Sequence, residues 1–145
     1  MFEYQVEIHR PLSEVYRAFK DPDNLPRWLT GLQRTVPVSG TPGEVGSVTK
    51  QIYLERGRVV EMIETITAHE PERLFGGTLD APGMQADMRV DFIDGGDSTT
   101  VRFQTDFNAR SFLMRLMLPF MKGAIRKRQA GDLETFKQMV EAGEL

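Results

Sequence analysis

The sequence contains no cysteine, and this absence excludes several kinds of chemistry at once. Without a thiol the chain cannot form a disulfide, use a thiolate nucleophile or bind a metal through sulfur. It also has only two histidines, His9 and His69, which is too few for a metal site built on two or three imidazoles beside other typical ligands. We therefore expect no metal and no cofactor.

A positive net charge is also missing, since the formal charge is -3 at pH 7. This balance gives no electrostatic reason to bind nucleic acid, and we expect no nucleic-acid partner. No apolar run is long enough to cross a bilayer, and no signal-peptide pattern opens the chain, so we expect a cytoplasmic protein. With 145 residues and 40% apolar content, residues 1–145 are expected to form a single domain.

Motifs for nucleophilic catalysis and phosphate binding are absent too. No serine lies in a nucleophile elbow, and no glycine-rich loop precedes a helix in the way that phosphate binding requires. His9 falls on the polar side of an alternating segment, and His69 lies in "TAHEPER", which resembles a turn. Both imidazoles are therefore predicted to be solvated at the surface.

The first residues alternate between apolar and polar side chains, which predicts a half-buried strand over residues 2–8. From Pro11 the apolar residues recur at helical spacing, which predicts a helix that ends before Pro22. The next stretch, "DPDNLPRWLTGL", predicts a second, very short helix capped by Asn24, with Pro26 in its first turn. Trp28, the only tryptophan, lies on its apolar face, which must pack on another part of the molecule.

Residues 32–108 predict six strands separated by short turns rich in glycine and proline, which indicate antiparallel hairpins. The last two strands alternate most clearly. Their apolar faces carry Met84, Ala86, Met88, Val90 and Phe92, then Val101, Phe103, Thr105 and Phe107.

The C-terminal third is helical in its periodicity up to about residue 142. Pro119 predicts a break, with a short helix before it and a long helix beginning there. The segment up to residue 124 is apolar on nearly every side, which indicates a second contact besides the sheet: a pocket, a partner subunit or a membrane. A basic run, Lys122 and 126–128, adjoins it and suits either an anionic membrane surface or a solvated helix face.

Three segments, "RPLSEVYRAFKDPDNLPRWLTGL", "ITAHEPERL" and "GDLETFKQMVEAG", resemble the SRPBCC or START-like superfamily, the polyketide cyclase/dehydrase and lipid transport type. The resemblance covers nearly the whole chain. It implies an α+β helix-grip (START/Bet v-like) fold, in which a curved antiparallel sheet wraps around a long C-terminal helix and two short helices follow the first strand. It also implies an internal cavity for apolar small molecules, with Trp28 packing across its entrance as part of a lid.

The leading functional expectation is therefore a protein that binds an apolar or aromatic small molecule, lipid-like or polyketide-like, between the sheet and the C-terminal helix. The candidate ligand-binding residues are Trp28, Tyr53, Met62, Met88, Phe103, Thr105, Met117, Met121 and Gln129. Methionine is flexible and polarizable, which suits an adaptable cavity wall as well as ordinary core filling.

The alternative is a cofactor-independent cyclase or dehydratase that uses one inward acid or base. Glu64 is the candidate catalytic residue, if its strand turns it inward beside Met62, because burial would raise its pKa. The other interpretations of Glu64 are an ion pair, or a position at a strand edge near solvent. Asp132 lies on the apolar stripe of the last helix and allows three interpretations: it pairs with Arg128, it relieves a kink, or it has a binding role.

A third reading is a protein-interaction or homodimerisation module that uses the apolar segment 112–120.

Overall fold

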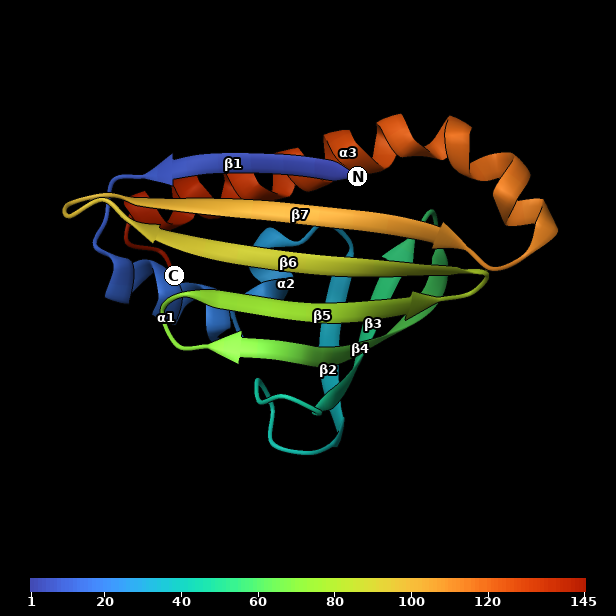
Figure 1. The fold of residues 1–145 in the computed structure, drawn as a ribbon, viewed down its shortest axis with the longest axis horizontal. Helices are drawn as coiled ribbons and strands as arrows, with labels where there is room; N and C mark the ends of the chain where they lie inside the picture. Colours follow the sequence, from blue (N-terminus) through green and yellow to red (C-terminus); the bar gives the residue numbers. More distant parts are fainter.

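The computed structural model describes all residues 1–145 and consists of one antiparallel sheet with three helices (Figure 1). The elements are β1 (Phe2–Ile8), α1 (Leu12–Lys20), α2 (Leu25–Trp28), β2 (Leu32–Ser39), β3 (Val48–Glu55), β4 (Arg58–Glu70), β5 (Leu74–Ala81), β6 (Met84–Asp94), β7 (Thr99–Ala109) and α3 (Phe112–Glu141). Their order and type confirm the predicted helix-grip fold, with two short helices after the first strand and a long helix at the end.

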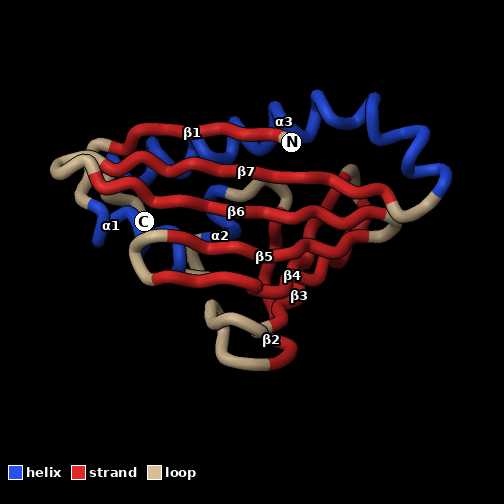
Figure 2. The backbone as a smooth tube through the Cα atoms, viewed as in Figure 1, coloured by secondary structure: helices blue, strands red, loops and turns tan.

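The seven strands lie in the order β1-β7-β6-β5-β4-β3-β2, and all neighbours are antiparallel. Pro37 lies in β2, an edge strand, where a missing amide hydrogen costs little. Register shifts occur in the pairings β2–β3 and β4–β5, and such bulges bend and twist a sheet. Figure 2 shows β2, β3 and β4 turning across the direction of the other strands, so that the sheet curves around its inner face.

The packed core gathers at one end of this curved sheet. It contains side chains from β1, β6 and β7, from both short helices and from the second half of α3. Its aromatic residues contact one another at favourable angles, with Phe136 of α3 4.8 Å from Trp28 and 5.7 Å from Phe19 between ring centroids. These contacts hold α1 and α2 against α3 although neither short helix would be stable alone.

The long helix differs from the prediction, because Pro119 lies inside one continuous 30-residue helix and does not separate two. The helix begins at Ser111, whose Oγ accepts a hydrogen bond from the Met114 amide at 3.1 Å. Pro119 removes one intrahelical hydrogen bond near Arg115, but this region is exposed, so water can satisfy the free carbonyl. In Figure 1 the first turns of α3 run at an angle to the rest. A proline inside a helix is a usual cause of such a bend, and Pro119 does not end the helix. No helix, α3 included, combines the length and the apolar content needed to cross a membrane.

Candidate functional site

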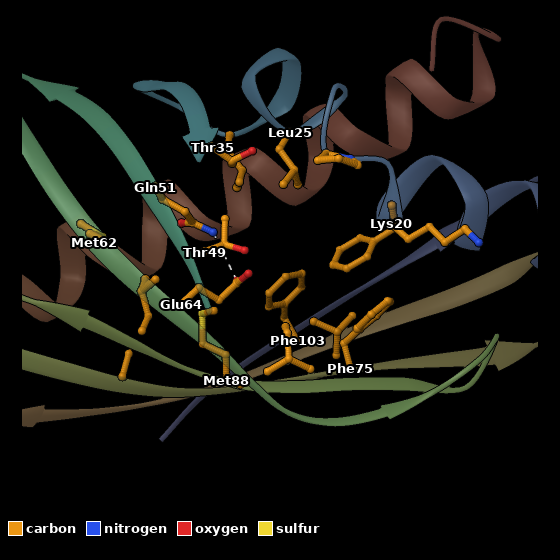
Figure 3. Close-up of a pocket in the computed structure, with 18 of the residues that line it drawn as sticks. Lys20, Leu25, Thr35, Thr49, Gln51, Met62, Glu64, Phe75, Met88 and Phe103 are labelled. Carbon is orange, nitrogen blue, oxygen red and sulfur yellow. Dashed lines mark hydrogen bonds between the residues drawn. The ribbon is translucent and has the colours of Figure 1, made fainter. Parts of the chain in front are cut away.

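A cavity of about 760 Å³ lies between the concave face of the sheet and the three helices (Figure 3). It is lined by 36 residues, 19 of them hydrophobic, from β2 to β7 and from α1, α2 and α3. Pockets that bind small molecules usually measure about 300–1,000 Å³ and are mostly apolar. The size and the lining of this cavity therefore suit one small organic molecule.

The apolar wall comes from the inward positions of alternating strands. Because side chains alternate across a sheet, every second residue of β6 from Met84 to Val90 lines the cavity, and Phe92, next on the same face, belongs to the packed core. The large apolar side chains of this wall are Met62, Ile66, Phe75, Leu79, Met84, Met88, Val90, Phe103 and Phe107. Trp28, Leu25 and Leu29 add apolar surface from α2 and the residue after it.

A connected polar group interrupts this wall on β3 and β4. The Tyr53 hydroxyl donates to Gln51 Oε1 at 3.0 Å, and Gln51 Nε2 donates to Glu64 Oε2 at 3.2 Å. All three residues line the cavity, and Figure 3 shows the Gln51–Glu64 bond between neighbouring strands of its wall. By contrast, Glu61 on the opposite face of β4 is exposed and pairs with Lys50 at 3.6 Å.

Burial changes the ionisation of this group. Burial of Glu64 raises the pKa of its carboxyl, and the hydrogen bond from Gln51 lowers it by less. Burial is also the main cause that raises the pKa of the Tyr53 hydroxyl, and the nearby charge of Glu64 adds to it. Tyr53 therefore remains a hydrogen-bond donor, while Glu64 is a carboxyl group that can hold or release a proton closer to neutral pH than an exposed glutamate.

A second polar cluster fixes α3 at the cavity. Asp132 accepts hydrogen bonds from the Thr30 amide, at 3.2 Å, and from the Thr30 hydroxyl. Burial is the first cause that raises the pKa of Asp132, and the two bonds from Thr30 oppose it. Arg128 pairs with Glu55 at 2.6 Å and also donates to the Thr30 carbonyl. Thr30, not Arg128, therefore supplies the hydrogen bonds to Asp132, and the cluster joins α3 to β3 and the segment after α2.

Two buried polar atoms at the cavity have no partner. They are Trp28 Nε1, an indole donor, and Gln129 Oε1, an amide acceptor on α3. A buried polar atom without a partner is costly, and a ligand or water that pairs with it recovers that cost.

The predicted site residues do not all meet here. Glu64 and six of the nine ligand-binding candidates line the cavity: Trp28, Tyr53, Met62, Met88, Phe103 and Gln129. Thr105 lies buried on the inner side of β7 but outside the lining, and Met117 and Met121 also lie outside it. The two methionines lie outside the lining because α3 reaches the cavity only from Ile125 onward.

Trp28 itself is a buried wall residue, only 4% exposed, and packs on Phe19 and Phe136 in the core. Trp28 is therefore part of the packed core beside the cavity, which differs from the predicted position in a lid across the cavity entrance. Leu25 and Leu29 of the same segment are less buried and face the cavity with it.

The prediction for His69 was wrong, because the residue lies in β4 and lines the cavity. Its Nε2 is 2.6 Å from the Tyr16 hydroxyl, and its ring stacks on Phe75 with centroids 4.3 Å apart. The prediction failed because β4 continues to Glu70, so that "TAHEPER" is not a turn at His69. The register shift between Ile66 and Ala68 then reverses the alternation, so that residues 64, 66 and 69 share one face. Sequence reasoning also missed Gln51, although its spacing of two from Tyr53 was a usable signal.

No group of three or more histidine, aspartate or glutamate side chains is arranged to hold a metal ion.

Comparison with known families gives one match. The family model described as "Polyketide cyclase / dehydrase and lipid transport" matches residues 1–141. Among curated proteins, none matches the sequence significantly.

Several solved structures share the fold. The Zhui aromatase/cyclase from a Streptomyces species superposes with a TM-score of 0.80 at 14% identity, covering 97% of this chain and 92% of that one. Ara h 8.0201 gives a TM-score of 0.79 at 14% identity, covering 97% of both chains. A START superfamily protein from Mycobacterium smegmatis gives 0.75 at 14% identity, covering 96% of this chain and 97% of that one. At these identities the likeness concerns the fold alone.

Proposed function

Because the chain belongs to the polyketide cyclase / dehydrase and lipid transport family, we propose that it binds one small molecule with a large apolar or aromatic body inside the cavity. The observation that carries this proposal is the cavity of about 760 Å³, whose wall is mostly apolar and interrupted by few polar groups. Apolar surface that leaves water contributes about 25 cal/mol per Å², so such a wall favours an apolar ligand strongly.

The polar groups define how the ligand would lie. Glu64 and Gln51 form one polar position on β3 and β4, and the unpartnered Gln129 amide oxygen lies on α3. A ligand hydroxyl would donate to the Gln129 amide oxygen or to the Glu64 carboxylate, and a ligand carbonyl would accept from the Gln51 amide. The apolar body of the ligand would contact Phe103 and Met88. Such a small number of fixed polar contacts orients a ligand in an otherwise apolar pocket.

Fluorescence of the single tryptophan provides the test. Trp28 is buried and lines the cavity, so a bound ligand should change its emission. We would titrate fatty acids, sterols, flavonoids and aromatic polyketide mimics, and we expect a saturable change with one class. The variant Ala86→Phe, which fills the cavity from β6, should abolish the change, while Ala124→Phe on the exposed side of α3 should keep it. A wild-type protein that responds to no class, or an Ala86→Phe variant that responds like wild type, would contradict the proposal.

A second candidate function is a dehydratase or cyclase, favoured by the inward carboxyl of Glu64 with its raised pKa. In a β-hydroxy ketone, the Glu64 carboxylate would take the proton from the carbon next to the carbonyl. The same carboxyl would then give this proton to the departing hydroxyl, which leaves as water while the carbon–carbon double bond forms. The Gln51 amide would hold the Glu64 carboxyl in place by donating a hydrogen bond from Nε2 to Glu64 Oε2.

Glu64→Gln separates the two functions. If the protein is this enzyme, Glu64→Gln should lose at least about a hundredfold in turnover of a β-hydroxy ketone while keeping the Trp28 response to the ligand. Glu61→Gln, on the outer face of the same strand, serves as the matched control and should keep full activity. If the wild type binds the ligand but shows no turnover, the enzyme hypothesis is wrong and only the binding function remains.

A further inference from the structure

The first half of α3 carries an exposed apolar face made of Phe112, Leu113, Leu116, Met117 and Phe120. These are five of the eleven large apolar side chains that the molecule exposes, and they lie within nine residues of one another. Phe120 is 88% exposed and Phe112 is 75% exposed. Single exposed apolar residues are ordinary, but a cluster of this kind marks a contact surface.

The same segment is strongly basic although the whole chain is acidic. Between Asp106 and Asp132 there is no acidic residue, while the segment carries Arg110, Arg115, Lys122, Arg126, Lys127 and Arg128. At helical spacing Arg115, Lys122 and Arg126 follow one another along one flank of the apolar face. Arg115, Lys122 and Lys127 are exposed and make no ion pair within the molecule, so their charges face solvent.

This face also borders one end of the cavity. A Cβ placed on Gly83, beside the cavity residues Ala81 and Met84, would lie 3.7 Å from the Met114 side chain, so the first turn of α3 packs against this end of the cavity. Ile125, one turn beyond the exposed face, lines the cavity itself. Figure 1 shows this part of α3 projecting beyond the end of the sheet, where it is free to meet a flat surface.

We propose that residues 112–127 of α3 dock the protein on an anionic lipid bilayer, with the apolar face among the acyl chains and the basic flank at the headgroups. Exposed phenylalanine and leucine on one side of a helix, with lysine and arginine beside them, are the features of interfacial helices. A second copy of this chain is a poorer occupant, because a symmetric contact would bring two basic flanks together. The inference does not depend on which ligand the cavity takes.

Co-flotation of the 145-residue protein with vesicles tests the proposal. We expect binding to phosphatidylcholine vesicles that contain phosphatidylglycerol, weaker binding to phosphatidylcholine alone, and a decrease as salt is raised. Residues 112–120 should also become protected from hydrogen exchange when the anionic vesicles are added, which locates the contact on α3.

Two pairs of variants separate the apolar and the basic contributions. Phe112→Ser with Phe120→Ser should lower vesicle binding at least about tenfold, while Val45→Ser with Val59→Ser, which changes two exposed apolar residues outside α3, should leave it unchanged. Lys122→Gln with Lys127→Gln should lower binding to anionic vesicles by about fivefold per charge. Arg34→Gln with Arg58→Gln removes the same charge from exposed positions on β2 and β4 and should have little effect.

Several outcomes would overturn the proposal. Wild-type protein that stays in solution with anionic vesicles would do so, and so would equal binding to neutral and anionic vesicles. The proposal would also fail if the phenylalanine pair and its control lost the same amount of binding. If light scattering shows a dimer that Phe112→Ser with Phe120→Ser dissociates, and vesicles are not bound, the face belongs to a second copy of the chain.

Discussion

The two halves of α3 lie on one continuous helix but have opposite surroundings. The second half buries Leu133, Phe136 and Val140 in the core, each at most 2% exposed. The first half buries only Leu118 and exposes five large apolar side chains to solvent, namely Phe112, Leu113, Leu116, Met117 and Phe120. The bend at Pro119 and the cavity separate these regions, so one half anchors the fold while the other half is available for contacts outside it.

Replacing Phe136 by alanine should have the largest effect on stability, because it removes the largest fully buried side chain, which joins the second half of α3 to the core. Its ring is fully buried against Trp28 and Phe19, so its loss leaves a hole in the core and should cost about 3–5 kcal/mol of unfolding free energy. Phe120→Ala is the matched change on the exposed half and should cost less than about 0.5 kcal/mol. Urea denaturation measures both, and equal losses would contradict the contrast between the halves.

Pro119→Ala tests the exposed first half of α3 by a change that should stabilise it. Alanine restores a backbone hydrogen bond and should stabilise the first turns of α3 by up to about 3 kcal/mol, with a gain in helical circular dichroism. Slower hydrogen exchange in residues 112–120, with little change in the midpoint of global unfolding, would show that this half is only weakly coupled to the core. A loss of stability would mean that the bend itself is needed.

Met88→Ala compares the hollow region with the packed one. Met88 faces open cavity on one side, so its removal enlarges existing space and loses fewer contacts than a filled core position would. We expect a cost of about 1 kcal/mol, below the roughly 2–5 kcal/mol typical of a methionine or leucine in a filled core. A loss as large as that of Phe136→Ala would indicate that the cavity collapses around this side chain.

The pH dependence of Glu64 should be the smallest effect. Its pKa in the folded protein is raised by burial above the usual 4.5, so the unfolded chain loses this proton first as the pH rises. This residue therefore favours the fold most below pH 4.5, and its contribution declines until the pH has passed the raised pKa. Glu64→Gln should remove this decline in stability. Asp132, whose pKa is also raised, should still contribute a decline of the same kind in the variant. Identical pH curves for wild type and Glu64→Gln would contradict the burial of a titrating carboxyl.

Much of the architecture could be predicted because periodicity is local. The alternation over residues 2–8 and in β6 and β7 predicted strands, and the spacing of Val15, Tyr16 and Phe19 predicted α1. Pro119 misled this reasoning, because a proline at an exposed position bends a helix at a tolerable cost. His69 misled it too, because the polar segment after Ala68 suggested a turn although β4 continues to Glu70, and a register shift just before His69 sets the face on which it lies.

The sequence by itself determined the element order, the lack of thiol chemistry and the set of apolar side chains available for a cavity, since these follow from composition and local spacing. Only the tertiary structure decided which of those side chains face the cavity, because that depends on strand register and on the sheet's curvature. It joined Tyr53, Gln51 and Glu64 into one hydrogen-bonded group and paired Asp132 with Thr30. It also left Phe112 and Phe120 uncovered, since the first turns of α3 project past the end of the sheet while Phe136, in the second half, lies in the core.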